Sequence, residues 1–333
     1  MKIHPMTKTF LALTLSVPVI AQVVLPPPNS QGWIRLLRTN NPGDFYIANN
    51  GSLPPAQSKL TFPNATYGLR GDTMQVTGSP GGQVYFNQVF SHYRIRYEMH
   101  FPGATGNCGM LLHVQQNDAT TNGFPRSVES QGDPNQGMGQ LWPIGDVWVT
   151  IRAHVVNGTM TYVPSDTEIT YGGANWNSRV VAGKDGWANP SYAVLAARTG
   201  WVTQEADVHG SDSVADIVQD TVRIKYRQPR VSSGGTPNNV TKLLSSGLIA
   251  WQSEGRAVWY RNIEIMLYPQ DPLYTPLYVE FNRRNTITPR SENKILMARN
   301  GLLIFRESGM TESLFDLRGH KTVSSKSIFS LPR

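Results

Sequence analysis

The chain has little cysteine and little charge. Its 333 residues include one cysteine, Cys108, so neither an internal disulfide nor a cysteine cluster for a metal ion can form. Charged residues make up 16% of the chain, and the formal net charge of +7 comes from its ends. Residues 1–21 carry two lysines and no acid, residues 274–333 carry ten basic and five acidic residues, and the remainder carries 18 of each. Nucleic-acid binding draws on dense basic clusters, so the neutral middle of the chain predicts no nucleic-acid partner.

The chain also lacks an apolar run long enough to cross a bilayer, so we expect no transmembrane segment. Its longest such run, residues 10–21, follows a basic head and ends in small residues, which is the pattern of a cleavable signal peptide. A buried N-terminal strand is the alternative interpretation. We expect residues 1–21 to be a signal peptide and residues 22–32, with Pro26-Pro27-Pro28, to be a proline-rich linker. We therefore expect a bacterium to export the protein, which would then be periplasmic, extracellular or on the cell surface.

Helical periodicity is scarce between residues 33 and 272. Short runs of alternating apolar and polar residues, bounded by Gly, Pro, Asn and Asp, predict β-strands instead. Many short strands at regular spacing indicate a sandwich or a barrel. The expected strands are 74–77, 84–86, 92–100, 110–114, 146–155, 206–209, 214–218, 221–226, 248–251 and 260–265.

Alternation along residues 92–100 puts Arg94, Arg96, Glu98 and His100 on one face of their strand. In a sandwich this face is turned away from the core. It is therefore either solvent-exposed or the lining of a binding cleft.

Tryptophans are frequent and often stand among Gly, Asn and Gln. This mixture suits sugars, whose apolar ring faces stack on aromatic rings while their hydroxyls bind polar groups. Trp148 and Trp251 lie in apolar strands and are expected in the core. Trp142, Trp176 and Trp187 lie in Gly- and Asn-rich loops and are the predicted substrate contacts.

Two distant parts of the chain carry a family resemblance. Residues 107–114 with 125–131, and residues 251–255 running into 260–265, together resemble the 3-keto-disaccharide hydrolase family. The resemblance covers roughly residues 32–268. It implies a concanavalin-like jelly roll and a protein that handles carbohydrate. The expected architecture is thus all-β: a jelly-roll β-sandwich over residues 33–272, followed by a small β-type appendage.

The same resemblance implies cleavage of a glycoside with a ketone at C3, by removal of the C2 proton, elimination and later hydration. Glu129 is the predicted base or general acid, with His113 as its proton partner or as a metal ligand. Arg126, Gln131 and Trp142 are predicted to orient the substrate. A divalent cation could stabilise the enolate, although its ligands are unknown. The alternative is that Glu129 is a surface carboxylate paired with Arg126.

The chain departs from the family pattern at two positions, which leaves other functions open. Cys108 stands where serine is usual, and Gln140 where the family often has aspartate. Loss of that carboxylate favours a non-catalytic, lectin-like carbohydrate-binding domain. A conventional glycosidase would instead need two carboxylates, so Glu129 would require a partner such as Glu205 or Asp207. Asp207 and His209 share a strand face and could also join a site.

Gln252, Glu254 and Arg261 are expected to be scaffold residues. A Gln-Ser-Glu-Gly turn before a strand can satisfy backbone groups at a sheet edge.

The C-terminal stretch, residues 273–333, changes to a basic composition. It is either a solvated basic tail or a truncated form of the β module that some bacteria use as a secretion and sorting signal. The final strand expected of such a module is missing. If the module functions, the secretion machinery is a further partner.

Overall fold

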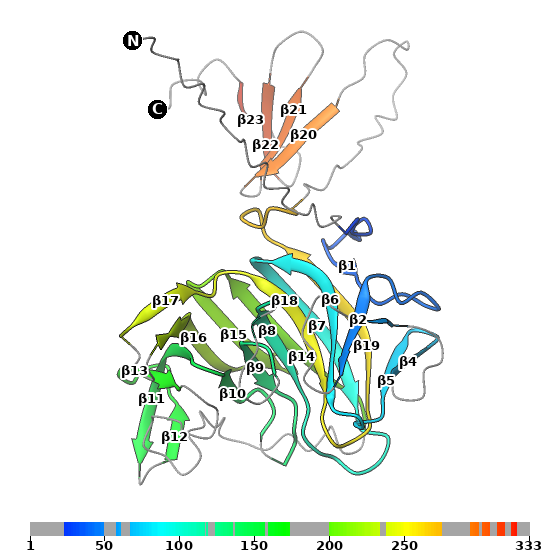
Figure 1. The fold of residues 1–333 in the computed structure, drawn as a ribbon. Coiled ribbons are helices and arrows are strands. Elements are labelled where there is room, and N and C mark those ends of the chain that lie inside the picture. The colour runs from blue at the N-terminus through cyan, green and yellow to red at the C-terminus, as the bar shows by residue number, and fades with distance from the viewer. Residues whose placement is uncertain are drawn as a thin grey trace, which may run out of the picture.

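The computed structural model describes residues 23–49, 58–60, 67–116, 118, 124–135, 137–156, 159–173, 200–233, 238–274, 294–299, 302–306, 312–316 and 321–324. Apart from one residue in a 3₁₀ conformation, all regular structure in these residues is β, and every strand pair is antiparallel (Figure 1). Two large sheets pack face to face. The predicted all-β jelly-roll sandwich is confirmed.

The larger sheet has twelve strands in the order β12-β11-β16-β15-β14-β7-β19-β5-β4, with β1 beside β19, β13 beside β11 and β17 beside β16. Its strands are β1 (Ile34–Arg35), β4 (Tyr67–Arg70), β5 (Thr73–Val76), β7 (His92–His100), β11 (Val147–Val156), β12 (Thr159–Tyr162), β13 (Glu168–Gly172), β14 (Val202–His209), β15 (Ser213–Val218), β16 (Thr221–Ser232), β17 (Val240–Leu243) and β19 (Val258–Leu267).

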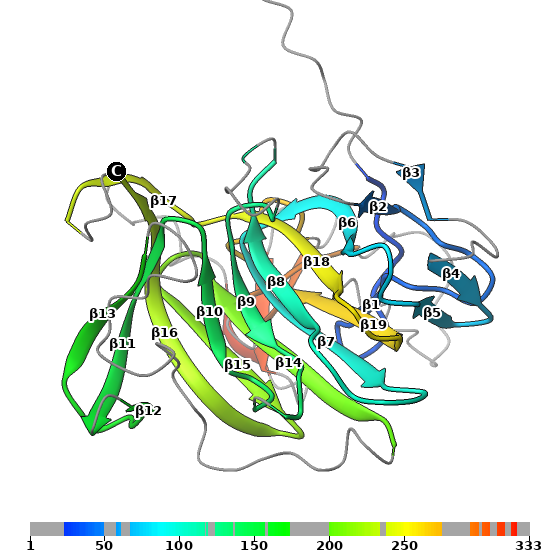
Figure 2. The same ribbon diagram turned by 60° about the horizontal axis from the view of Figure 1, so that its bottom comes forward.

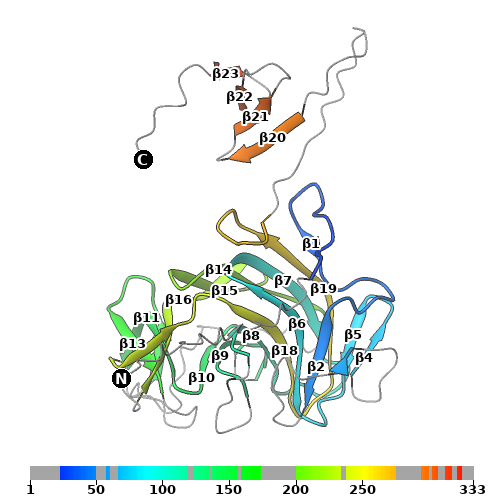
Figure 3. The same cartoon turned by 45° about the horizontal axis from the view of Figure 1, so that its top comes forward.

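The smaller sheet has seven strands in the order β10-β9-β8-β18-β6-β2-β3. Figures 2 and 3 show it as a second curved layer packed against the larger sheet. Its strands are β2 (Phe45–Asn49), β3 (Ser58–Lys59), β6 (Gly82–Phe90), β8 (Gly109–Val114), β9 (Ser127–Gln131), β10 (Leu141–Ile144) and β18 (Gly247–Ser253).

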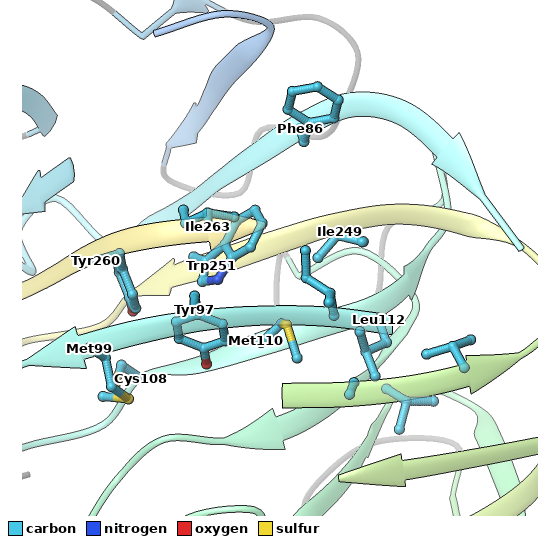
Figure 4. Close-up of a cluster of buried hydrophobic side chains, with 14 of the residues drawn as sticks. Phe86, Tyr97, Met99, Cys108, Met110, Leu112, Ile249, Trp251, Tyr260 and Ile263 are labelled. Carbon is cyan, nitrogen blue, oxygen red and sulfur yellow. The ribbon is translucent and has the colours of Figure 1, made fainter. Parts of the chain in front are cut away.

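The main core lies between the two sheets. Strand β7 shows why: its alternate residues Tyr93, Ile95, Tyr97 and Met99 are buried there, whereas the polar residues between them are half-exposed. Figure 4 shows Tyr97 beside Trp251, with Met110 and Leu112 of the smaller sheet close by. Burying a large apolar side chain contributes about 1.5–3 kcal/mol relative to exposure, so this layer holds the sheets together. Trp148 and Trp251 are fully buried, as predicted.

The C-terminal residues that the structure describes form a four-stranded antiparallel sheet. Its strands are β20 (Lys294–Arg299), β21 (Leu302–Arg306), β22 (Glu312–Asp316) and β23 (Lys321–Ser324). A role in secretion or sorting stays a prediction. Within the described ranges, no helix is long and apolar enough to cross a membrane.

The predicted signal peptide at residues 1–21, and Trp176 and Trp187, lie outside the described residues. Export and the substrate contacts of these two tryptophans therefore remain predictions.

Candidate active site

Glu129 lies in the middle of β9, opposite Leu111 of β8 and Trp142 of β10. Its neighbours Val128 and Ser130 point between the sheets, where Val128 joins the main core and Ser130 bonds to the larger sheet. Strand alternation therefore puts Glu129 on the opposite side. We call this side of the smaller sheet, turned away from the larger one, the site face. The Glu129 side chain is only about 6% exposed there.

Gly109 of β8 provides the space into which Glu129 folds. A methyl group built on Gly109 would lie 2.6 Å from Glu129 Oε1 and 2.9 Å from Gln252 Oε1. The carboxylate of β9 and the amide of β18 thus converge over one glycine from opposite sides. The reason for glycine here is space, because a side chain would displace both groups.

A polar row crosses the site face through this point. Gln131 pairs with Gly109, and Gln252 pairs with Gln83 of β6. All three glutamines are buried, and Gln252 Oε1 has no hydrogen-bond partner within the described part of the chain. A buried polar atom without a partner costs free energy, and a substrate hydroxyl could donate a hydrogen bond to this amide oxygen.

Gln252 was expected to be scaffold, but the structure places it in the site. The sequence does offer one indication of Gln252: it follows the apolar residues of strand Gly247–Ser253 and alternates with Trp251, so it lies on the opposite strand face from Trp251. This pattern does not show which strand face carries the site.

Aromatic rings flank the polar row. Trp142, which was predicted to lie in a loop, lies in strand β10 beside Glu129 and is about 7% exposed. Farther along the face, Tyr85 stacks on Tyr46 with ring centroids 5.9 Å apart. Burial raises the pKa of Tyr85 well above its usual value, so this hydroxyl is neutral at pH 7 and can donate a hydrogen bond. The site face thus combines a carboxylate, amides and aromatic rings, which is the chemistry that sugars require.

Glu254 is a second, half-buried carboxyl near this region. Burial raises its pKa, and a hydrogen bond with Asn107 opposes that shift. Asn107 also accepts a hydrogen bond from Gln131 Nε2 at 3.0 Å. A carboxyl with a raised pKa holds its proton to higher pH and can therefore act as an acid. Like Gln252, it was expected to be scaffold.

Gln131 itself holds a loop. Its Oε1 accepts hydrogen bonds from the backbone N–H groups of Gly132 (2.9 Å) and Asp133 (3.0 Å). Its backbone N–H donates to Gln140 O at 2.8 Å, which places Gln140 next to it. Gln131 is therefore in the site, although its side chain is occupied by the loop.

Arg126 does not pair with Glu129. Its guanidinium forms ion pairs with Asp118 and Asp146, and its backbone accepts a hydrogen bond from Gln115. These contacts clamp the loop that leads into β9. The predicted surface pair between Arg126 and Glu129 is absent from the described contacts. Arg126 instead stabilises the loop before β9.

His113 is not brought together with Glu129. It lies at the end of β8 in a bulge, with a φ of 53°. The residue is fully buried, and within the described part of the chain neither ring nitrogen has a hydrogen-bond partner. Burial lowers its pKa to about 4, and the charge of His92 in the larger sheet adds to that shift. Such an imidazole is neutral at pH 7.

Glu205, Asp207 and His209 lie on the larger sheet, away from Glu129. Glu205 binds Arg94 at 2.7 Å. Asp207 accepts a hydrogen bond from Tyr268 and lies 3.2 Å from His209 Nε2, and the His209 and Tyr268 rings stack. These groups form a cluster of their own. Glu205 and Asp207 therefore do not lie on the site face as partner carboxylates for Glu129.

The described residues contain no group of three or more His, Cys, Asp and Glu side chains arranged to hold a metal ion. The divalent cation remains a prediction without assigned ligands.

The molecule is thus an antiparallel β-sandwich with an enclosed, sugar-compatible polar row on one face. Residues 31–266 match the family model of the 3-keto-alpha-glucoside-1,2-lyase-like domain, and the chain belongs to this family. The predicted family is confirmed. No curated protein matches the chain by sequence.

Solved structures that the chain resembles are distant. One is a protein provisionally described as a glycosyl hydrolase from Parabacteroides distasonis (12% identity, 72% of this chain and 94% of that one, TM-score 0.44). Others are a Bacillus licheniformis β-glucanase (9%, 71% and 97%, TM-score 0.34) and the carbohydrate-binding module CBM66 from Bacillus subtilis (7%, 61% and 92%, TM-score 0.32).

Proposed function

We propose that the protein is an exported enzyme that cleaves the glycosidic bond of 3-keto-glycosides. The observation that carries this proposal is the convergence of the Glu129 carboxylate and the Gln252 amide over Gly109, beside Trp142. The family name supports cleavage of the bond from C1 to the glycosidic oxygen, because a 1,2-lyase removes groups from C1 and C2 and leaves a double bond between them.

The ketone at C3 makes the proton on C2 acidic. Glu129 removes that proton, and the electron pair of the C–H bond forms an enolate whose charge lies on the C3 oxygen. When the enolate collapses, the bond from C1 to the glycosidic oxygen breaks, and the leaving alcohol takes up a proton. Water then adds across the C1–C2 double bond, which completes a net hydrolysis.

Each group of the site face has a task in this scheme. Near exclusion of Glu129 from solvent strengthens its electrostatic interaction with a bound substrate. The Gln252 amide N–H can donate to the enolate oxygen. Trp142 offers a ring face for the sugar, and Glu254, with its raised pKa, is the candidate proton donor for the leaving alcohol.

Lectin-like binding without turnover is the second candidate. Gln140 favours it, because an amide stands beside Gln131 where the family often has a carboxylate. A conventional two-carboxylate glycosidase would have to pair Glu129 with Glu254, since Glu205 is bound to Arg94 on the larger sheet.

Proton NMR of the protein with a 3-keto-disaccharide and with its unoxidised parent tests the proposal. Cleavage of the keto sugar alone is expected. Cleavage of both sugars would indicate a conventional glycosidase, and line broadening without product would indicate a binding domain. A parallel series with a chelator tests the predicted cation, and secretion of the full chain from a bacterial host tests the predicted export.

A further inference from the structure

Gln204 of β14 reaches across the interior to the strand that carries Glu129. Its side chain is fully buried. Its Nε2 lies 2.9 Å from Ser130 Oγ, 3.2 Å from Ser130 O and 3.1 Å from Gln131 O. These acceptors belong to the two residues that directly follow Glu129. One amide of the larger sheet therefore holds the backbone of β9 next to the carboxylate.

Tyr97 of β7 fixes the orientation of this amide. Its hydroxyl donates to Gln204 Oε1 at 2.6 Å, so the NH₂ group of Gln204 must face β9. The Tyr97 ring is itself held edge-on against Trp251 and Tyr260, at centroid distances of 5.9 and 5.8 Å (Figure 4). The link from the packed core to β9 is thus rigid at both ends.

Packing alone does not explain an amide at this position. Burial of a polar group costs free energy unless every hydrogen bond is made, and an apolar side chain of similar volume would fill the same space. What the amide adds is direction, because its hydrogen bonds fix β9 relative to the larger sheet. Reactions are sensitive to such placement, since an error of about 1 Å can cost about 10²-fold in rate.

We propose that Gln204, oriented by Tyr97, is a positioning residue for Glu129. It acts through the β9 backbone and touches no substrate. This inference rests on the proposed function for its effect on turnover, but its effect on the Glu129 carboxylate and on β9 can be measured without any substrate.

The test compares Gln204→Met and Tyr97→Phe with the control Val202→Ala. Val202 is a buried core residue of the same strand, and the described contacts give it no hydrogen bond to β9, so its truncation destabilises the core without removing the link. Four quantities are measured in the full chain: kcat and KM for a 3-keto-glycoside, the infrared titration of Glu129 identified by difference against Glu129→Gln, and hydrogen exchange of residues 127–131.

Gln204→Met is expected to lower kcat by about 10- to 100-fold with little change in KM, because the carboxylate is misplaced but the binding groups remain. It should also shift the Glu129 titration and speed exchange in β9. Tyr97→Phe should change kcat, the Glu129 titration and the β9 exchange in the same direction but less. It carries the test if Gln204→Met fails to fold. Val202→Ala should lower the melting temperature alone.

An unchanged Glu129 titration and unchanged β9 exchange in Gln204→Met and Tyr97→Phe, relative to Val202→Ala, would overturn the inference. If the wild-type chain cleaves no glycoside, the proposed function fails. The titration and the exchange still decide whether Gln204 positions Glu129.

Discussion

The two outer faces of the sandwich both carry polar side chains, but these side chains differ in their partners and in their exposure to solvent. On the larger sheet, Arg94 binds Glu205, Arg96 binds Glu264 and Arg261 binds Glu98, and most of these groups are partly exposed. We call this the ion-pair face. On the site face, the polar groups are nearly excluded from solvent, and the Gln252 amide and the Glu129 carboxylate converge over Gly109.

The difference indicates where chemistry can occur. Partly exposed ion pairs satisfy each other and contribute little, typically about 0–1 kcal/mol each. The Glu129 carboxylate is enclosed, and Gln252 Oε1 beside it has no hydrogen-bond partner in the described part of the chain. Burying such polar groups costs free energy, and such sites are commonly functional. The ion-pair face thus belongs to the scaffold, and the site face is where a substrate is expected.

Glu129→Gln should have the largest effect on activity. Loss of the base is expected to reduce turnover of a 3-keto-glycoside by about 10³-fold, measured by NMR or by reducing-sugar release. The matched control on the ion-pair face is Glu264→Gln, which should leave turnover unchanged. Turnover within a few-fold of wild type for Glu129→Gln would remove Glu129 from the mechanism.

Gly109→Ala should reduce turnover by about 10²-fold while the chain still folds. The new methyl group would meet Glu129 Oε1 at 2.6 Å, so the carboxylate must move from its place. Gly103→Ala is the control, because nothing lies within 4 Å of its Cβ position. Equal activity of the two variants would show that the Glu129 position is not critical.

The buried His113 should make the free energy of unfolding depend on pH. Because its pKa falls from 6.5 to about 4 on folding, the unfolded chain binds the proton first as the pH drops. The free energy of unfolding should therefore decrease between pH 6.5 and 4, by about 3 kcal/mol in total.

His113→Asn should flatten this dependence in urea titrations at pH 7 and 4.5. Asparagine tolerates the positive φ at this position. His154→Asn, at an exposed histidine that contacts Asp166, should not flatten it. If both variants keep the wild-type slope, His113 is not the source of the acid sensitivity.

The smallest effect is expected for the pair of Arg96 and Glu264. A double-mutant cycle with Arg96→Gln and Glu264→Gln should give a coupling below about 1 kcal/mol that weakens with salt. Arg96→Gln alone should cost more than Glu264→Gln, because Arg96 also stacks over Trp33 at 3.9 Å. A coupling of several kcal/mol would contradict the role assigned to the ion-pair face.

Much of the fold could be predicted from local pattern. The alternation in β7 identified both the strand and its two faces, and the apolar strands around Trp148 and Trp251 proved to be core. The site was predicted only in part. Arg126 stands three residues before Glu129 yet pairs with Asp118 and Asp146, because chain proximity does not determine ion pairing.

Sequence alone determined the family and the all-β class, because alternation and short motifs are local properties of the chain. Tertiary structure alone decided which face of each strand is the site face. It also turned His113 inward at a bulge, brought Gln252 of β18 to Glu129, and brought Gln204 of β14 to Ser130 and Gln131. These placements depend on strand register and sheet packing, and both are set by contacts between residues far apart in the chain.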